Sequence, residues 1–244
     1  SAIAGATDYE AQVWSGSGWA NSMTMGSQLV ANAEGMFVEY EESGGQAVVG
    51  VSNGANNNFI WNAWNGGWAG TNTAGVQNDF ANGRLVRDVG TDRMGLCYTD
   101  VDNDLGFLEW SGSGWNTFAE FEVTGNLTNG FQGRPIACEF ETTAGRDGYL
   151  MMMHSDSTIV EYEYWTGTGA PTTPAQISTL GDSWEVRSTR TGDGNILVLT
   201  YNDGDTQYDF SYWNGTQWST AQLIEASSIP TLTPSTIPID MVAR

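Results

Sequence analysis

A repeated hairpin sequence constrains this chain more than any other feature. Each copy has an alternating stretch, a tryptophan, a short glycine-containing turn and, in four copies, a second tryptophan. The five copies are Tyr9–Trp19, Phe59–Trp68, Phe107–Trp115, Val160–Gly169 and Tyr208–Trp218. Self-similarity at a fixed period indicates a repeat architecture, in which each unit buries its apolar surface against its neighbours. The leading tryptophans, 50, 46, 55 and 48 residues apart, are Trp14, Trp64, Trp110, Trp165 and Trp213.

Each unit resolves into four short strands separated by turns. In the fifth unit these strands are expected at Trp184–Arg190, Ile196–Tyr201, Tyr208–Trp213 and Trp218–Ile224, with Gly, Asn and Asp between them. The second strand is almost continuously apolar, which indicates burial on both faces. Four strands per unit and a period near 50 residues predict an all-β fold, a five-bladed β-propeller of four-stranded antiparallel blades. A β-sandwich is the alternative.

The two chain ends fit into the same pattern. Ala2–Asp8 matches the second strand of a unit, and Ile237–Val242 matches the first strand. We therefore expect the C-terminal strand to join the N-terminal blade and close the ring, which removes an open sheet edge. The chain would form one domain over 1–244, with blades at 237–244 plus 1–30, 31–78, 79–126, 127–180 and 181–230.

Charge excludes several classes of partner. The chain has 29 Asp and Glu against 8 basic residues, all of them arginine, for a net charge of −21. Nucleic-acid binding depends on Lys and Arg that neutralise phosphates, and an anionic membrane surface repels such a chain for the same reason. Charged residues make up 15% of the chain and hydrophobic residues 40%, so it is not a disordered acidic tail.

Several features bear on the compartment. No apolar stretch approaches the roughly 20 residues of a membrane span. Ser1–Ala4 carries no basic leader segment, so the chain is expected to follow a processed or upstream leader. The lysine-free composition, rich in Asn, Gly and Thr, favours an extracellular or cell-surface location. Cys97 and Cys138 are compatible with one disulfide or with two buried thiols.

The repeated strand, Trp-x-Gly-x-x-Trp and strand resembles the repeats of tachylectin-like and fucose-binding propeller lectins and of related bacterial surface propellers. The resemblance covers nearly the whole chain. It implies sugar sites in the crevices between blades, against aromatic, Arg and Glu side chains. Arg87, Arg134 and Arg187 lie in or beside first strands, and the first and second units lack an equivalent arginine.

The tryptophans have two interpretations. An indole can stack on a sugar, so the second tryptophans, Trp19, Trp68, Trp115 and Trp218, are candidate ligand contacts. A residue that recurs in every unit is more often part of the packing between blades. We favour packing for the leading set. The fourth unit has Ala170-Pro171 in place of the second tryptophan, so a site built on that residue would not be fivefold.

One acidic loop is a candidate cation site. Asp100, Asp102 and Asp104 alternate along the chain, and such spacing lets carboxylates converge on Ca²⁺. The match to a calcium loop is partial, because Leu105 stands at the sixth position and Ser111 at the twelfth. The alternative is that these residues simply make a hairpin turn.

Catalysis is not expected. Some five-bladed propellers are glycoside hydrolases with paired carboxylates, and first-strand acids such as Glu39, Glu139 and Asp240 are candidates for a channel. These acids are distributed around a ring and do not form one asymmetric pair. His154 and Ser155 point to opposite faces of a strand, so they form no triad by adjacency.

The sequence therefore predicts a non-catalytic extracellular binding module that takes a glycan between its blades and needs no cofactor. The alternative is a structural subunit of a filament, appendage or surface layer, because a strand that closes its own ring can also close a neighbour's. A five-bladed glycoside hydrolase is the third hypothesis. Neither nucleic-acid binding nor membrane insertion is expected.

Overall fold

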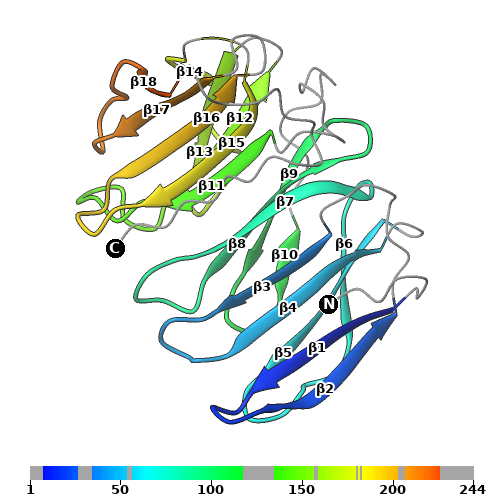
Figure 1. Ribbon diagram of the computed structural model, residues 1–244. Coiled ribbons are helices and arrows are strands. Elements are labelled where there is room, and N and C mark those ends of the chain that lie inside the picture. The colour runs from blue at the N-terminus through cyan, green and yellow to red at the C-terminus, as the bar shows by residue number, and fades with distance from the viewer. Residues whose placement is uncertain are drawn as a thin grey trace.

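The computed structural model describes residues 8–26, 35–53, 57–117, 135–156, 159–179, 181, 183–202 and 207–225. Within these ranges the chain contains strands and turns and no helix. Figure 1 shows the strands gathered into sheets that follow one another in chain order, from the β1–β2 hairpin at one end to the β15–β18 sheet at the other.

Four of the five sheets contain four antiparallel strands. The two-stranded sheet consists of β1 (Asp8–Trp14) and β2 (Trp19–Gly26). The others, in chain order, are β3 (Met36–Tyr40), β4 (Ala47–Asn53), β5 (Asn58–Trp64) and β6 (Asn72–Gly75); β7 (Phe80–Arg87), β8 (Met94–Asp100), β9 (Leu105–Trp110) and β10 (Trp115–Thr117); β11 (Ile136–Phe140), β12 (Leu150–Asp156), β13 (Ile159–Trp165) and β14 (Ala175–Ile177); and β15 (Ser183–Arg190), β16 (Ile196–Asn202), β17 (Gln207–Trp213) and β18 (Gln222–Glu225).

The repeated tryptophans set the register of every sheet. Each leading tryptophan ends its strand, and in the four larger sheets it pairs with the first residue of the preceding strand, as Met94 pairs with Trp110. The second tryptophan, where present, lies opposite the first across the hairpin, with ring centroids 5.2–5.6 Å apart. Such cross-strand aromatic pairs stabilise a hairpin.

A glycine two residues after each leading tryptophan makes the hairpin turn. The five glycines all have positive φ, between 73° and 97°, a backbone conformation that residues with a Cβ rarely adopt. The recurring Trp-x-Gly sequence is therefore a backbone requirement of the turn. These five residues are Gly16, Gly66, Gly112, Gly167 and Gly215.

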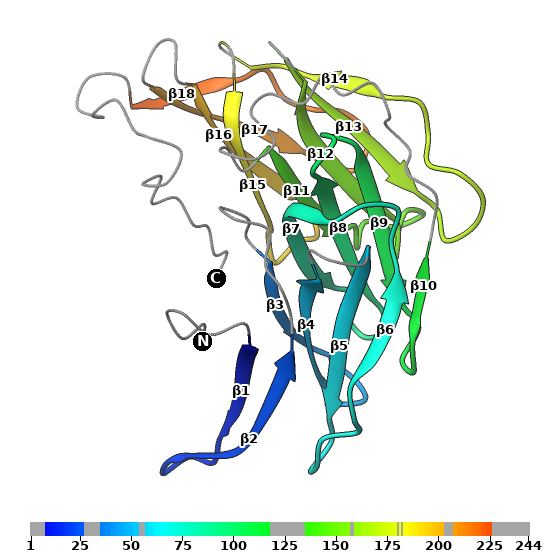
Figure 2. The same cartoon turned by 90° about the vertical axis from the view of Figure 1, so that its right-hand side faces the viewer.

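The hydrophobic core lies between neighbouring sheets. One cluster joins β3–β6 to β7–β10, a second joins β7–β10 to β11–β14, and a third joins β11–β14 to β15–β18. A smaller cluster joins the β1–β2 hairpin to β4 and β5. The first strands of successive larger sheets contact each other, and in Figure 2 β3 and β7 both lie on the left of their sheets.

The structure confirms the predicted all-β class and the four-stranded antiparallel units. The strands expected in the fifth unit correspond to β15–β18, although β18 begins at Gln222 and Trp218 contributes only an isolated bridge. Asp8 belongs to β1, whereas the rest of Ala2–Asp8 and all of Ile237–Val242 lie outside the described residues. Among the residues described, no helix is long and apolar enough to cross a membrane.

Candidate functional site

Each first strand of three consecutive sheets ends next to a buried carboxylate. Glu41 follows β3, Asp88 follows β7 and Glu141 follows β11. Trp110 Nε1, from the next sheet, donates to Glu41 Oε1 at 2.6 Å, and Trp213 Nε1 donates to Glu141 Oε2 at 2.9 Å. A hydrogen bond to a charged, buried acceptor is among the stronger ones in proteins. Glu41 and Glu141 therefore hold their sheets against the indole of the following sheet.

The crevice between β7–β10 and β11–β14 differs, because its carboxylate pairs with an arginine while the indole of the next sheet, Trp165, donates to Gly169 O. Arg93 lies just before β8, and its Nη1 contacts Asp88 Oδ2 at 3.2 Å and Gly148 O at 3.3 Å. Its Nε donates to Glu109 Oε1 at 2.8 Å. Burial raises the pKa of Asp88, and the Arg93 charge opposes that rise. The result is a cation held between two carboxylates.

Aromatic rings from the next sheet form one wall of this crevice. The Arg93 guanidinium lies 5.3 Å from the Phe140 ring centroid and 5.8 Å from that of Trp165. Gly148 has φ +78°, and a Cβ there would lie 3.0 Å from Arg93 Nη1, so a glycine keeps the space open. Cation–π contacts of this kind fix the plane of a guanidinium.

The Arg93 crevice is partly open to solvent. The Arg93 side chain is 29% exposed and that of Glu109 is 13% exposed. Among the described residues, Arg93 Nη2 makes no hydrogen bond, and Glu109 Oε2 receives only a long one, from Asn116 Nδ2 at 3.4 Å. The site thus presents a charged donor and a charged acceptor side by side.

The next crevice also contains an arginine, which engages both oxygens of its carboxylate partner. Arg146 Nε and Nη2 donate to both Glu141 oxygens at 2.6–2.8 Å. Its guanidinium lies over Tyr164, 4.2 Å from the ring centroid, and within about 5.2 Å of the Tyr149 and Trp213 centroids. This bidentate pair leaves fewer groups for a ligand than the Arg93 crevice does.

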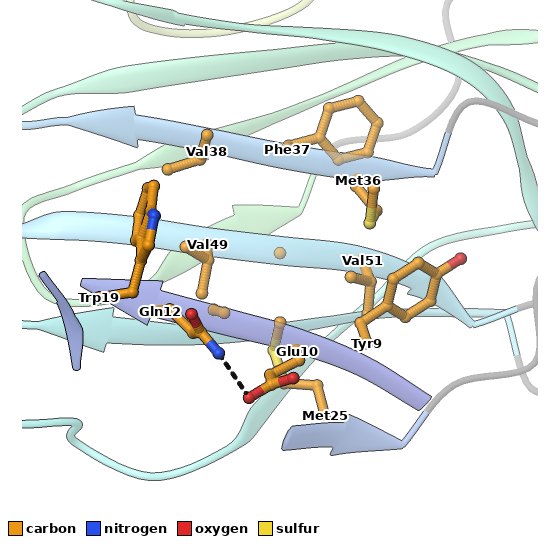
Figure 3. Close-up of a pocket in the computed structure, with 12 residues that line it drawn as sticks. Tyr9, Glu10, Gln12, Trp19, Met25, Met36, Phe37, Val38, Val49 and Val51 are labelled. Carbon is orange, nitrogen blue, oxygen red and sulfur yellow. Dashed lines mark hydrogen bonds between the residues drawn. The ribbon is translucent and has the colours of Figure 1, made fainter. Parts of the chain in front are cut away.

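A cavity of about 510 Å³ lies between the β1–β2 hairpin and strands β3 and β4. Figure 3 shows Trp19 at the Val38 end of this cavity and Tyr9 beside Val51. Most of its lining is apolar, and Gln12 donates to Glu10 at its edge, at 2.9 Å. Trp19 is 67% exposed.

The predicted ligand tryptophans fall in different settings. Trp19 borders the cavity, and Trp68 donates from Nε1 to Asn21 O at 2.6 Å. Trp115 and Trp218 are half-buried and pack on the clusters between sheets. Of the leading set, Trp110, Trp165 and Trp213 are buried as expected, Trp64 is half-buried and Trp14 is exposed.

The predicted arginines do not gather in one site. Arg87 is exposed on β7, and Arg187 is buried in an ion pair with Glu185, with Nη2 and Oε1 2.6 Å apart. Arg134 lies outside the described residues. The sequence did not single out Arg93 and Glu109 as candidate ligand residues. The available signals were an arginine just before an apolar second strand and a glutamate just before a leading tryptophan.

The acidic loop is organised as a turn. Asp100 Oδ1 accepts hydrogen bonds from the backbone N–H groups of Asp102 and Asp104, at 2.8 and 2.9 Å. In the part of the chain that the structure describes, no three His, Cys, Asp or Glu residues are placed to hold a metal ion. Calcium binding here stays a prediction, which thermal unfolding with and without calcium would test.

The single histidine of the chain is buried against a glutamate. His154 Nε2 lies 3.8 Å from Glu163 Oε1, and both side chains are buried. The Ser155 hydroxyl donates to the backbone carbonyl of Ser183. These two neighbours have separate partners, as the alternation along a strand predicts.

Solved structures similar to this chain decide the architecture. The lectin of Aleuria aurantia, described as a six-bladed β-propeller, matches 93% of this chain and 72% of its own at 16% identity, with a TM-score of 0.55. The BP39L lectin from Burkholderia pseudomallei matches 83% of this chain and 60% of its own at 14% identity, with a TM-score of 0.57. The fold is a β-propeller. Its sheets are therefore blades.

A third similar structure is that of the SapL1 lectin in complex with α-methyl fucoside. It matches 91% of this chain and 74% of its own at 13% identity, with a TM-score of 0.56. The sequence matches no described protein family, and no curated protein is similar to it. At such identities the comparisons establish the fold alone.

Proposed function

We propose that this propeller is a non-catalytic carbohydrate-binding module whose main site is the crevice around Arg93 and Glu109. The observation that carries the proposal is the partly exposed guanidinium–carboxylate pair, 2.8 Å apart, against the rings of Phe140 and Trp165. The resemblance to fucose-binding lectins implies aromatic, Arg and Glu side chains between blades, and this crevice contains all three types.

The chemistry of the crevice fits a neutral polyol. One sugar hydroxyl would accept from Arg93 Nη2, and its neighbour would donate to Glu109 Oε2. Hydrogen bonds with a charged partner are stronger than hydrogen bonds between neutral groups. A sugar with two adjacent hydroxyls forms one such bond with each side chain, so it should bind more tightly than a ligand with a single hydroxyl. Asp88, Glu109 and the net charge of −21 disfavour an anionic glycan. Trp165 is buried, so it supports the guanidinium and does not offer an open stacking face.

Titration calorimetry with α-methyl fucoside, followed by a panel of neutral glycosides, tests this site. Arg93→Ala and Glu109→Gln should each weaken binding at least about tenfold, because each leaves a ligand hydroxyl without its charged partner. Arg87→Ala is the matched control, since Arg87 is an exposed arginine of the same blade. Binding that is lost in Arg87→Ala and kept in Arg93→Ala would place the site elsewhere.

The proposal includes a five-bladed ring closed by the chain ends, with blade boundaries as predicted from the sequence. One feature supports it. In β3, Val38 is 63% exposed, whereas Cys138, at the matching position of β11, is fully buried by the preceding blade. We propose that Ile237–Val242, with Ala2–Asp8, covers β3 and occupies the cavity beside it.

Self-assembly is the second candidate function, favoured by the apolar residues at both ends of the row of blades. Tyr212, Leu223 and Ile224 are exposed on the last blade, and Trp14 is exposed on the first. The same surfaces on two copies would form a head-to-tail contact. Light scattering at low and high salt distinguishes a closed monomeric ring from a head-to-tail assembly, because screening of the negative charge favours association.

We also propose an extracellular or cell-surface location, testable by fractionating the source cells.

A further inference from the structure

The two cysteines of the chain lie in one layer between neighbouring blades. Cys97 is on β8 and Cys138 is on β11, and both are fully buried in the cluster that joins these blades. Cys138 Sγ donates to Arg84 O at 3.5 Å. Arg84 is the residue that pairs with Cys97 across β7 and β8. The Cys138 thiol therefore reaches the backbone immediately beside Cys97, and the two thiols lie close enough to interact.

The matching position in the following layer makes a similar contact. In the following layer the position of Cys138 is taken by Ser188, whose hydroxyl donates to Cys138 O at 3.1 Å. The position of Cys97 is taken there by Met153. In both layers a side chain of one first strand thus reaches the preceding blade, and among the described layers only the first brings two thiols together.

We propose that Cys97 and Cys138 form a disulfide that covalently joins the two blades. With a low-molecular-weight disulfide as oxidant, one cysteine thiolate attacks it, forming a mixed disulfide and releasing one small thiol. The second cysteine thiolate then displaces the other small thiol and forms the bond between Cys97 and Cys138. The two cysteines lose two electrons and two protons, which the two released small thiols take up.

Burial determines when this bond can form. It raises the pKa of the Cys97 thiol well above the usual value, as does the neighbouring Cys138. The thiolate is the reactive form, so exchange in the folded protein is slow. The bond should therefore form while the blades assemble and, once formed, resist reduction until the protein unfolds. It closes a loop of about 40 residues, which reduces the entropy of the unfolded chain.

Refolding from urea with oxidised and reduced glutathione tests the proposal against refolding in excess reductant. We expect no free thiol in the oxidised protein when assayed in denaturant, and a urea midpoint about 1 M higher than in the reduced protein. Trypsin cannot separate the two cysteines, because Arg134 precedes Pro135 and the chain has no lysine. Further cleavage after glutamate should yield peptide 94–109 linked to 123–139.

Paired variants control for effects of the substitution itself. Cys97→Ala/Cys138→Ala should show the same midpoint under both conditions, and each single alanine variant should retain one free thiol as a monomer. Two free thiols after oxidative refolding of the original chain would overturn the proposal. So would cross-links only between chains, or a linked protein that unfolds at lower urea than the reduced one.

Discussion

At the scale of single residues, matching carboxylates in successive blades take different partners. Glu41 and Glu141 reach the indole of the next blade. Asp88 is one methylene shorter and pairs with Arg93, whereas Trp165 donates to Gly169 O at 3.1 Å. This change places a guanidinium in the crevice where the other blades have a carboxylate–indole bond. Three changes in the repeat create the chemistry of the proposed site, because Asp88, Arg93 and Glu109 stand where the preceding blade has Glu41, Gln46 and Ala63.

Replacement of single tryptophans tests the importance of the carboxylate–indole bonds. Trp110→Phe removes the donor to buried Glu41, and we expect it to lower the free energy of unfolding by about 2–3 kcal/mol. Trp165→Phe is the control, because its acceptor is a neutral carbonyl on an exposed turn, and the loss should be smaller by about 1 kcal/mol. Urea titration measures both. Equal losses would show that ring volume alone matters.

Glu139 should make stability depend on pH. Burial raises its pKa to about 7, against the nearby charges of Arg190 and Arg84. The pKa of Glu139 is thus higher in the folded than in the unfolded chain, so the unfolded chain releases this proton first as the pH rises. The free energy of unfolding therefore falls between about pH 4.5 and pH 7. Glu139→Gln should reduce that fall by up to about 3 kcal/mol. The readout is the difference in urea midpoint between variant and original chain at pH 5 and pH 8; no change in this difference would refute the assignment.

At the scale of elements, β3 and β11 show how a neighbour determines the environment of a strand. Both are first strands with the same register to the second strand. All five residues of β11 are buried between two blades, whereas Met36, Val38 and Tyr40 of β3 are exposed on one face. An apolar strand face of this kind normally packs against another element.

Val38→Asp tests whether a strand covers β3 in solution. If the C-terminal strand lies against Val38, a charge there would be buried, and the free energy of unfolding should fall by at least about 2 kcal/mol. Val89→Asp is the matched control in an exposed turn and should change it by less than about 0.5 kcal/mol. Similar, small effects of both variants would mean that β3 is open.

Sequence periodicity predicted these elements well because tryptophan and glycine have local roles. Trp110 pairs across its hairpin and Gly112 makes the turn, so both are visible in a short window of sequence. The Arg93 crevice was not predicted, because its parts come from two blades. Arg93, Glu109 and Trp165 are separated along the chain, and only the packing of one blade on the next brings them together. The arginines selected by position, Arg87 and Arg187, are in fact exposed or paired within their own strand.

At the scale of the whole molecule, the first and the last blade of the row both expose aromatic side chains. Trp14 and Trp19 are exposed in the first blade, although the leading tryptophans of the third, fourth and fifth blades pack on the blade before them. In a closed ring the blade before the first would be the last, where Tyr212 is exposed. Closure would therefore bury both surfaces at once.

Removal of residues 237–244 tests closure directly. The truncated chain should unfold at a lower temperature and associate as its concentration rises, because the β3 face stays uncovered. Calorimetry and light scattering are the measurements. Ile237→Ser/Ile239→Ser/Met241→Ser keeps the chain length and should have the same effects. A truncated chain that stays monomeric and equally stable would contradict the closed ring.

The unequal crevices have a consequence for valency. Of the three crevices between the four-stranded blades described, one has a partly open arginine–carboxylate pair. In the second, both carboxylate oxygens are engaged by an arginine, and one of them also by an indole. In the third, the carboxylate is bonded to an indole. If the Arg93 crevice is the single glycan site, as proposed, one copy holds one glycan at a time and cannot bridge two cells. Agglutination would then require several copies displayed together, so avidity would depend on how densely a surface presents the protein.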